Sequence, residues 1–442
     1  MAHIAPFRAL RYDPGRVEIS GVVTQPYDKI TPEMQERYYA ASPHNLVRII
    51  LGKREAKDDA GENTYTRAAA NFQDWRRQGI FLQEAQPSIY RYVQDFTVPG
   101  GMKELQRRGF IGLGRLEDYS DNVVFRHEQT LAKPKADRLD LLRATRAHFG
   151  QLFMLYSDPA GEIDSLLTAA SAPEIDIGDE YGVRHQLSKI SDPALIDLVR
   201  SKMRDKQLII ADGHHRYETA LNYRNQRRGV ADTAPLLGAR GAFSEIPPYE
   251  MVMMTFINME SPGLVILPTH RVVHGLAGFS AEDLRQKASR YFSVDEVDPS
   301  VDAARASGIL REAGHAGTAL LAVTADRVFL LDTPKAAEAD LLSGLSLRQQ
   351  SLDVVQLHKC LLEGVLGISE EAIRNQQNIS YVREASEAMS RVRAGGANVA
   401  FLMNPVRMRQ VRDIAFAGEV LPQKSTDFYP KLLSGLTIYA LE

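Results

Sequence analysis

The sequence predicts an α+β (mixed α/β) fold, because the helical and strand-like segments follow one another without regular alternation. A doubly wound sheet would need strands and helices that alternate along the chain. The 442 residues are too many for one typical hydrophobic core, so we expect two or three domains. Hydrophobic residues make up 44% and charged residues 25% of the chain, which is ordinary for a globular protein.

The first part of the chain is irregular, and its first helix is predicted to start after Thr31, an N-cap, with Pro32 at the first helical position. Pro99-Gly100-Gly101 separates two strand-like runs and predicts a hairpin. The periodicity predicts helices over 62–78 (with Trp75), 137–149 and 193–203, and strands over 46–51, 88–98, 103–116, 152–156 and 209–211, with two more in 249–267.

The composition of the segments changes near residue 275, so we predict an N-terminal mixed α/β region over 1–275 and a C-terminal mixed α/β region over 276–442. In the second region the patterns predict helices over 281–292, 301–313, 353–366 and 406–417, a hairpin of 318–323 with 327–331, and a strand over 400–403.

Charge and cysteine content narrow the classes of function. The formal net charge of −3 gives no overall basic bias for a nucleic-acid partner, which would need a local basic patch instead. The single cysteine, Cys360, excludes an internal disulfide and a cysteine-rich metal site, and fits a reducing compartment. Because the N-terminus lacks a signal-peptide pattern and no apolar run reaches about 18 residues, we expect a cytoplasmic protein with no membrane partner.

The most informative segment lies in the middle of the chain. Residues 209–211 predict a buried strand, Asp212-Gly213 is a turn pair, and a helical pattern follows. Free N–H groups and the helix dipole make such a helix start receptive to anions. The first turn of that helix carries two imidazoles and a guanidinium, His214, His215 and Arg216, which favours a phosphate site.

The same residues allow simpler interpretations. Asp212 can act as an N-cap, the two histidines can be solvated, and Arg216 can pair with Glu218 or another carboxylate. A metal is a third interpretation, for which His214 and Glu218 have the better spacing because they share a helix face. Adjacent histidines point about 100° apart and chelate poorly.

Two further groups of polar residues are candidates for the same chemistry. Lys133 and Lys135 can bind phosphate oxygens, and Glu128 can act as a base or hold Mg²⁺; a solvated loop and first helical turn is the simpler alternative. His270-Arg271 closes an apolar strand, where a His that caps the sheet through a backbone bond is the alternative. Walker, dinucleotide-binding and Gly-x-Ser-x-Gly patterns are missing from the sequence.

Over nearly its full length the chain resembles the family of unknown function numbered DUF1015. The resemblance rests on six motifs in the same order: Pro26-Tyr27-Asp28; His127-Glu128 with Lys133-Pro134-Lys135 and Asp137-Arg138-Leu139; Asp212-Gly213-His214-His215-Arg216-Tyr217-Glu218; Pro268-Thr269-His270-Arg271; Leu352-Asp353-Val354 near His358; and Pro422-Gln423-Lys424-Ser425-Thr426 with Phe428-Tyr429-Pro430-Lys431-Leu432. The family resemblance itself implies no activity.

A second, local resemblance is to the ParB, sulfiredoxin and free-serine-kinase superfamily, on Asp212-Gly213-His214-His215-Arg216. It implies a nucleotide-binding core in which Gly213, His214, His215 and Arg216 hold the phosphates. Sulfiredoxins carry a reactive Cys in this turn where the present chain has His214, so the resemblance does not extend to sulfinic acid reduction. The layout of a DNA-binding ParB clamp is not visible either.

These observations predict a nucleotide-dependent phosphotransferase that acts on a small metabolite such as a hydroxy amino acid. The expected cofactor is ATP, ADP or CTP with Mg²⁺. The predicted residues, expected to converge in space, are Asp212, His214, His215 and Glu128 for catalysis; Gly213, His214, His215, Arg216, Lys133 and Lys135 for the nucleotide; His270, Arg271 and Lys424 for the substrate; and Asp212 and Glu128 for Mg²⁺.

Two alternatives stay open at this point. A ParB-like regulatory protein would bind nucleotide without metabolite turnover and would dimerise or bind a partner in response. A phosphate-ester hydrolase would use the same anion site with water as the acceptor. A homodimer is a possible oligomeric state of the protein.

Overall fold

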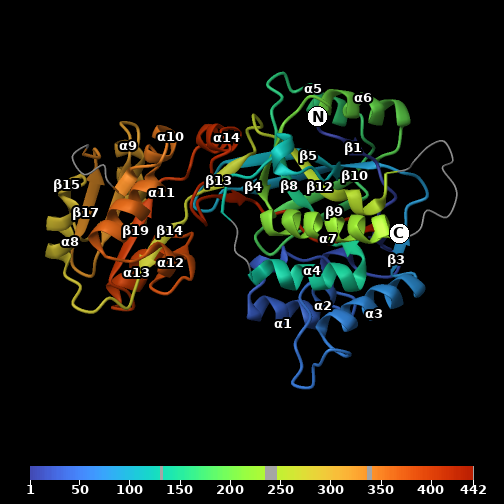
Figure 1. Ribbon diagram of the computed structural model, residues 1–442, viewed down its shortest axis with the longest axis horizontal. Helices are drawn as coiled ribbons and strands as arrows, with labels where there is room; N and C mark the ends of the chain where they lie inside the picture. Colours follow the sequence, from blue (N-terminus) through green and yellow to red (C-terminus); the bar gives the residue numbers. More distant parts are fainter. Residues whose placement is uncertain (130–132, 234–245, 336–340, 442) are drawn as a thin grey trace. The chain divides into compact units, whose positions relative to one another are not determined.

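The computed structural model describes residues 1–129, 133–233, 246–335 and 341–441, with only the backbone described for 133–135 and 230–233. The chain forms two compact units (Figure 1). The first unit contains Met1–Arg126, Thr130–Val265 and Tyr429–Glu442, and the second contains His127–Gln129 and Ile266–Phe428. The chain therefore leaves the first unit, builds the second, and returns for its last residues.

The first unit is built on a mixed sheet with the order β6-β11-β8-β12-β5-β4-β10-β9, in which β1 pairs with β5. The pairs β11–β6 and β12–β8 are parallel, and the remaining pairs are antiparallel. The strands are β1 (Ile4–Ala5), β4 (Ile89–Thr97), β5 (Glu104–Arg115), β6 (Val124–Phe125), β8 (Leu152–Tyr156), β9 (Ile175–Gly178), β10 (Arg184–Ile190), β11 (Leu208–Asp212) and β12 (Met251–Asn258). Two short pairs join distant segments: β2 (Leu10–Tyr12) with β3 (Phe81–Gln83), and β7 (Ala147–His148) with β21 (Tyr439–Ala440).

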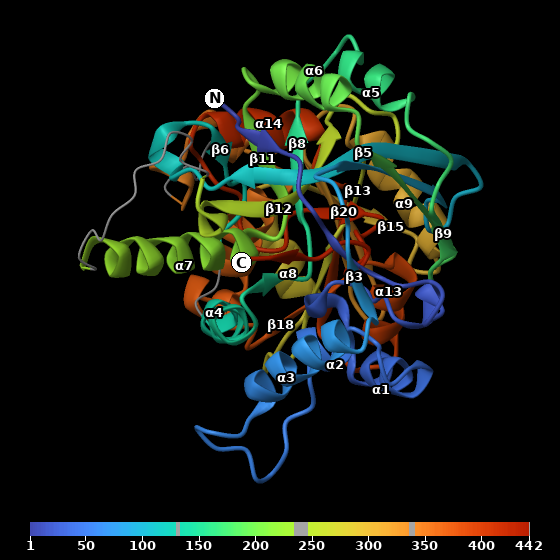
Figure 2. The same ribbon diagram turned by 90° about the vertical axis from the view of Figure 1, so that its right-hand side faces the viewer.

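Helices cover this sheet, and Figure 2 shows α5 and α6 lying together, with α4 and α7 on the other side. Apolar side chains of α5, α6 and α7 pack with the strands in one buried cluster, to which α7 contributes Tyr217, Ala220 and Leu221. The helices are α1 (Pro32–Ala41), α2 (Val47–Ile50), α3 (Thr64–Arg77), α4 (Lys133–Thr145), α5 (Glu162–Leu167), α6 (Pro193–Met203) and α7 (His214–Thr233), with short 3₁₀ turns η1 (Ile19–Gly21), η2 (Tyr27–Lys29), η3 (Tyr119–Asp121) and η4 (Pro248–Glu250).

Local sequence signals explain where several of these helices begin. The Thr31 side chain accepts a hydrogen bond from the backbone N–H of Met34, which confirms the predicted start of α1. Asp192 caps α6 in the same way, and Asn63 forms a capping box that starts α3. The predicted hairpin is confirmed by the antiparallel pairing of β4 with β5.

Two of the predicted elements of this unit need correction. Residues 46–51, predicted as a strand, contain the short helix α2 instead. The Asn45 side chain accepts a hydrogen bond from the N–H of Val47 at 2.9 Å, which turns the chain into a helical start that an apolar run alone does not reveal. The helix predicted over 137–149 starts at Lys133 and ends at Thr145, because Ala147–His148 pair with the C-terminal strand β21.

The second unit is built on an antiparallel sheet with the order β15-β17-β16-β19-β14-β18. Helices α9 and α13 contribute apolar residues to a core with its strands. The elements are β13 (Val265–Leu267, at the division between the units), β14 (His270–Val273), α8 (Ala281–Ala288), β15 (Ser293–Val297), α9 (Ala303–Ala313), β16 (Ala319–Val323), β17 (Val328–Asp332), α10 (Leu347–Gln350), α11 (Asp353–Gln356), the π-helix η6 (Leu357–Val365), α12 (Glu370–Arg374), β18 (Ile379–Val382), α13 (Ala385–Arg393), β19 (Val399–Met403), α14 (Met408–Phe416) and β20 (Asp427–Tyr429).

The expectation that His270-Arg271 closes an apolar strand is wrong, because both residues begin the new strand β14. The helix predicted over 353–366 is present, but it continues from α11 into the π-helix η6. The predicted hairpin of 318–323 with 327–331 is confirmed by the pairing of β16 with β17.

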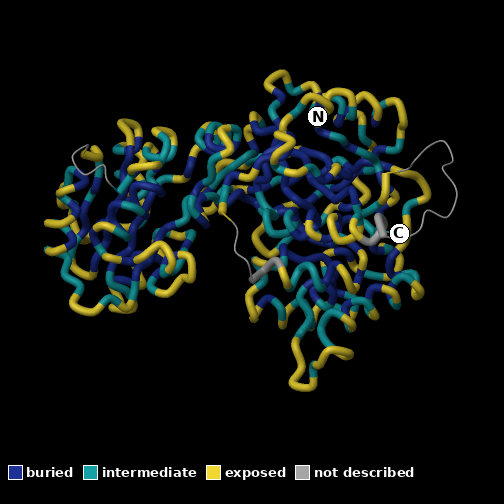
Figure 3. The backbone as a smooth tube through the Cα atoms, in the orientation of Figure 1, coloured by how far each residue is buried: buried dark blue, intermediate teal, exposed yellow. Residues whose placement is uncertain are grey.

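The mixed α/β fold class is confirmed by both units, and Figure 3 shows a buried interior in each of them. The predicted boundary at residue 275 stays a prediction. Among the described residues, no helix combines the length and the apolar character that a membrane crossing requires.

Candidate functional site

The turn from β11 into α7 has the geometry that the sequence predicts. Gly213 has a φ of +96°, in the left-handed region that favours glycine. A Cβ atom at this position would lie 2.9 Å from Leu152 Cδ2 and 3.1 Å from Arg216 Nε. The backbone therefore approaches its neighbours closely at the point where the helix N-terminus opens.

Arg216, in the first turn of α7, is held in place by two contacts. Its guanidinium donates a hydrogen bond to the backbone carbonyl of Gln151, and Nη2 lies 3.5 Å from Asp212 Oδ2. A guanidinium fixed in this way presents its remaining donors in one orientation, which suits recognition of a planar or tetrahedral anion.

Asp212 is the acidic member of a cationic cluster, which we define as Asp212, Lys29, His214, Arg216 and Lys431. Burial raises the pKa of Asp212, but the charges of Lys431, Arg216, Lys29 and His214 outweigh burial and hold that pKa well below its ordinary value. The carboxylate is therefore ionised at neutral pH.

Lys431 belongs to the cluster although it lies near the C-terminus. Its backbone carbonyl accepts a hydrogen bond of 2.8 Å from Gln94 Nε2. The neighbouring carbonyls of Tyr429 and Pro430 accept hydrogen bonds from the buried side chain of Arg107, which also donates to Gln94 Oε1 at 3.0 Å. This buried network fixes the backbone that carries Lys431.

A small cavity of about 70 Å³ lies beside the turn. Its lining includes Arg216, Thr219, Tyr27 and Arg138, and the Arg138 guanidinium stacks 4.1 Å above the Tyr27 ring. The buried Thr219 hydroxyl has no hydrogen-bond partner among the residues that the structure describes. A volume of this size holds a few water-sized groups, and it is too small for a whole nucleotide.

The residues predicted for the nucleotide are brought together in part. Asp212, Gly213, Arg216 and the half-buried His214 and His215 all lie in the turn and the first turn of α7. The side chains of Lys133 and Lys135 lie outside the described residues. Their predicted contact with phosphate stays a prediction.

A second predicted group lies in the other unit, where Glu128 joins the segment of Lys424 and Thr426. The backbone N–H of Lys424, a residue with a φ of +58°, donates a hydrogen bond to Glu128 Oε1. The Thr426 hydroxyl donates to Glu128 Oε2 at 3.3 Å and lies 2.8 Å from His127 Nε2. Burial raises the pKa of Glu128, and Lys424, Thr426 and Arg271 partly offset that rise.

His270 and Arg271 have backbone partners in this unit. The N–H of Met403 donates to His270 Nδ1 at 3.3 Å, and burial together with Arg271 lowers the pKa of His270 to about 4. The fully buried guanidinium of Arg271 donates to the carbonyls of Thr269 and Lys424. The predicted substrate contacts of His270, Arg271 and Lys424, and the predicted convergence of the two groups on one substrate, stay predictions.

Metal binding at Asp212 and Glu128 also stays a prediction. Among the described residues, no group of three or more His, Cys, Asp or Glu side chains has the arrangement of a metal site. Three of the side chains that act on Asp212, namely Lys431, Arg216 and Lys29, are cations, and cations repel a bare divalent ion.

Several residues of this site were not predicted from the sequence as site residues. They are Tyr27, Lys29, Arg138, Thr219 and Lys431. A signal existed for three of them, because Tyr27, Arg138 and Lys431 lie in motifs that carry the family resemblance. Nothing in the local sequence of Lys431 indicates that it lies near Asp212.

Residues 4–355 match the DUF1015 family, described as "Protein of unknown function". The chain belongs to the DUF1015 family. No curated protein matches the sequence. The family assignment confirms the resemblance that the motifs indicate, and by its own description it brings no activity with it.

Several solved structures are weakly similar to this DUF1015 protein. A conserved hypothetical protein from Pyrococcus furiosus is 12% identical, with a TM-score of 0.35 over 71% of this chain and 92% of its own. A free serine kinase in complex with AMP is 12% identical, with a TM-score of 0.36 over 71% and 89%. SbnI with a C-terminal truncation, from Staphylococcus aureus, is 10% identical, with a TM-score of 0.34 over 74% and 87%. These scores are too low to assign a shared fold or a shared activity.

Proposed function

We propose that the protein is a nucleotide-dependent phosphotransferase that acts on a small hydroxyl-bearing metabolite such as a hydroxy amino acid. The observation that carries the proposal is the cationic cluster around Asp212 at the N-terminus of α7. Phosphoryl transfer needs fixed positive charge and positioning more than covalent chemistry. A glycine turn, a helix N-terminus and the cations Lys29, Arg216 and Lys431 supply both requirements.

In this proposal the terminal phosphates of the nucleotide occupy the turn. The backbone N–H groups that open α7 and the guanidinium of Arg216 bind phosphate oxygens. The cavity beside Thr219 accepts a phosphate-sized group, so the nucleoside part extends outside it.

The transfer step has a simple balance. The acceptor hydroxyl oxygen forms a bond to the terminal phosphorus, and the bond from that phosphorus to the leaving phosphate oxygen breaks. The hydroxyl proton leaves to a nearby base or to water. Because the surrounding cations make Asp212 a weak base, its proposed part is to orient the acceptor or a phosphate-bound cation.

Mg²⁺ enters this proposal only together with the nucleotide. The cations near Asp212 oppose a bare divalent ion, and phosphate oxygens bring the negative charge that offsets them. We therefore expect no Mg²⁺ binding in calorimetry without nucleotide. Binding should appear once ADP or ATP is present.

The deciding experiment incubates the purified chain with ATP, ADP or CTP and Mg²⁺, with and without serine or other hydroxy acids, and follows products by ³¹P NMR. Nucleotide consumption that depends on an acceptor supports the phosphotransferase. Binding or slow hydrolysis that ignores every acceptor supports the ParB-like regulator. Phosphate release from phosphoserine without nucleotide supports the hydrolase, and no binding of any nucleotide contradicts the proposal.

Two variants test whether the nucleotide binds at the cationic cluster. Lys431→Ala should weaken nucleotide binding by about tenfold, the size expected for one charge-assisted phosphate contact. Lys103→Ala removes the same charge from an exposed position in the loop between β4 and β5, and it should bind as the wild type does. Equal loss in both variants would place the nucleotide elsewhere.

A further inference from the structure

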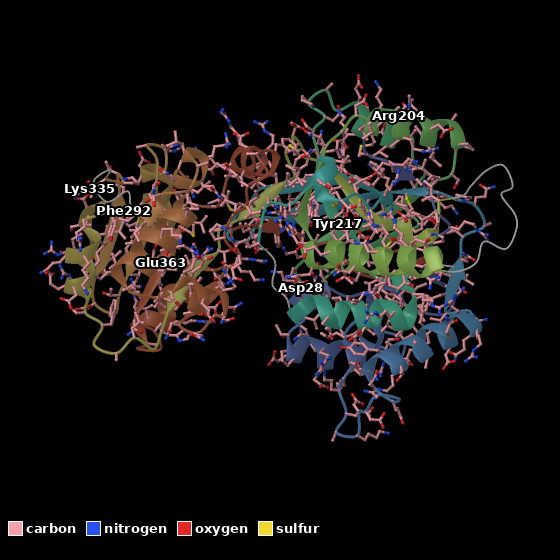
Figure 4. All side chains as sticks on the ribbon, viewed as in Figure 1. Asp28, Arg204, Tyr217, Phe292, Lys335 and Glu363 are labelled. Carbon is pink, nitrogen blue, oxygen red and sulfur yellow. The ribbon has the colours of Figure 1, made fainter. Side chains whose placement is uncertain are left out.

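The second unit holds a cavity of about 230 Å³ that the proposed function does not use. It lies beside α11, η6 and α12, and Figure 4 labels Glu363 of η6, one of the residues that line it. Its walls are apolar at Leu345, Val355, Ile373 and Val420. Cavities that hold drug-sized ligands measure roughly 300–1,000 Å³, so this one suits a molecule of about one ring.

One polar side chain in this cavity has an unmet hydrogen-bonding group. His358 is 8% exposed, and its Nε2 atom is buried without a partner among the described residues. The residue lies on the π-helix η6, a geometry that is frequent at functional sites. A buried nitrogen without a partner costs stability, and since His358 lines the cavity, a small rotation of its ring would bring this nitrogen to a ligand that satisfies it.

Burial and the local charges determine the protonation state of His358. Burial lowers the pKa of His358 well below its ordinary value, and the charges of Arg271 and Lys359 lower it further. The imidazole is therefore neutral at pH 7. A neutral imidazole carries one N–H, and with that proton at Nε2 it donates to an oxygen of the ligand.

The rim of the cavity is charged but balanced. Lys359 Nζ lies 2.8 Å from Glu363 and 3.6 Å from Glu370, and Arg374 pairs with Glu370 at 2.9 Å. Because two cations and two carboxylates already satisfy one another, a ligand with a net charge would have to break these pairs. A neutral ligand does not.

We propose that this cavity is a binding site for a neutral, ring-sized molecule that bears a carbonyl or amide oxygen, with His358 donating a hydrogen bond to that oxygen. The apolar walls take the ring, and the balanced rim excludes charged analogues of the same shape. This site lies wholly within the second unit and does not depend on the nucleotide site.

The test uses two probes of the same shape, benzamide and benzoate, on the full chain, with binding measured by saturation-transfer NMR and titration. We expect benzamide to bind with at least about tenfold higher affinity than benzoate, because the charged analogue disrupts the rim. His358→Phe should reduce benzamide binding by about five- to tenfold, the loss of one hydrogen bond.

The same variants separate binding from folding. Since Nε2 has no protein partner, His358→Phe should keep or raise the thermal midpoint, whereas a structural role would lower it. Leu345→Trp, at a half-buried wall position, should block benzamide by filling the cavity without touching the imidazole. The proposal is overturned if neither probe binds, if benzoate binds equally well or better, or if both variants bind benzamide as the wild type does.

Discussion

Gly213 is the position at which the geometry of the turn between β11 and α7 can be tested most directly. Its φ of +96° disfavours a side chain, and an added Cβ would lie 2.9 Å from the flexible end of Leu152 and 3.1 Å from Arg216. A non-glycine residue in this region costs about 1–3 kcal/mol. The Leu152 contact adds only a small amount, because a terminal methyl can shift. We therefore expect Gly213→Ala to lower the free energy of unfolding by about 1–3 kcal/mol.

The measurement is urea unfolding followed by fluorescence of Trp75, the single tryptophan of the chain. Trp75 is buried in α3 of the first unit, so its signal reports the unit that contains Gly213. The same variant should bind ATP more weakly than the wild type, because Arg216 is displaced.

Gly229→Ala is the matched control on the same helix. Gly229 lies within α7, and an added Cβ there meets nothing within 4 Å. Alanine in a helix is favoured over glycine by about 0.5–1 kcal/mol, so this variant should be more stable than the wild type. If both variants shift stability in the same direction, or if Gly213→Ala leaves it unchanged, the assigned backbone geometry is wrong.

Three further predictions concern charge. Asp212→Asn should bind ATP at least as tightly as the wild type, because it removes a negative charge from the proposed phosphate site. The same variant should lose acceptor-dependent turnover. Loss of binding alone would contradict the role proposed for Asp212. Burial lowers the pKa of His148 to about 4, so the neutral form is favoured on folding, and the free energy of unfolding should fall as pH drops from about 6.5 to 4. The variant His148→Phe should lack that part of the pH dependence when its unfolding is measured by Trp75 fluorescence. If its unfolding free energy changes with pH as in the wild type, the role assigned to His148 is wrong. Lys424→Ala, at an exposed residue, should raise the KM for the acceptor with little change in nucleotide affinity if the predicted substrate role is correct, and an unchanged KM would remove Lys424 from that role.

The sequence predictions are correct where one local signal determines the element, and they fail where local signals compete or where side-chain periodicity does not show the hydrogen bonding. The start of α1 at Thr31-Pro32 and the strand Leu152–Tyr156 depend on neighbouring residues, and both were predicted correctly. Residues 46–51 were predicted wrongly because the Asn45 side chain competes with an apolar pattern that fits a strand or a buried helix. The π-helix η6 differs from an α-helix in hydrogen bonding, which side-chain periodicity does not show.

The residues of the candidate site were predicted only in part. The turn and the residues Asp212 to Arg216 follow one another in sequence, so a local pattern could find them. The partners of Asp212 come from far along the chain, and their proximity depends on the sheet and on the return of the chain to the first unit.

Because the chain returns to the first unit, its last residues contribute Lys431 to the proposed site. Residues 429–441 are tied to the rest of the first unit by hydrogen bonds from Gln94, from Arg107 and between Thr24 and Ser434, and by the pairing of β21 with β7. Lys431 can act on Asp212 only while these contacts hold the segment in place. The part of the chain that defines the family match ends at residue 355, so this contribution lies outside it. The proposed phosphate site therefore combines the turn at Gly213 with a lysine more than 200 residues later, on a segment that follows the second unit in the chain.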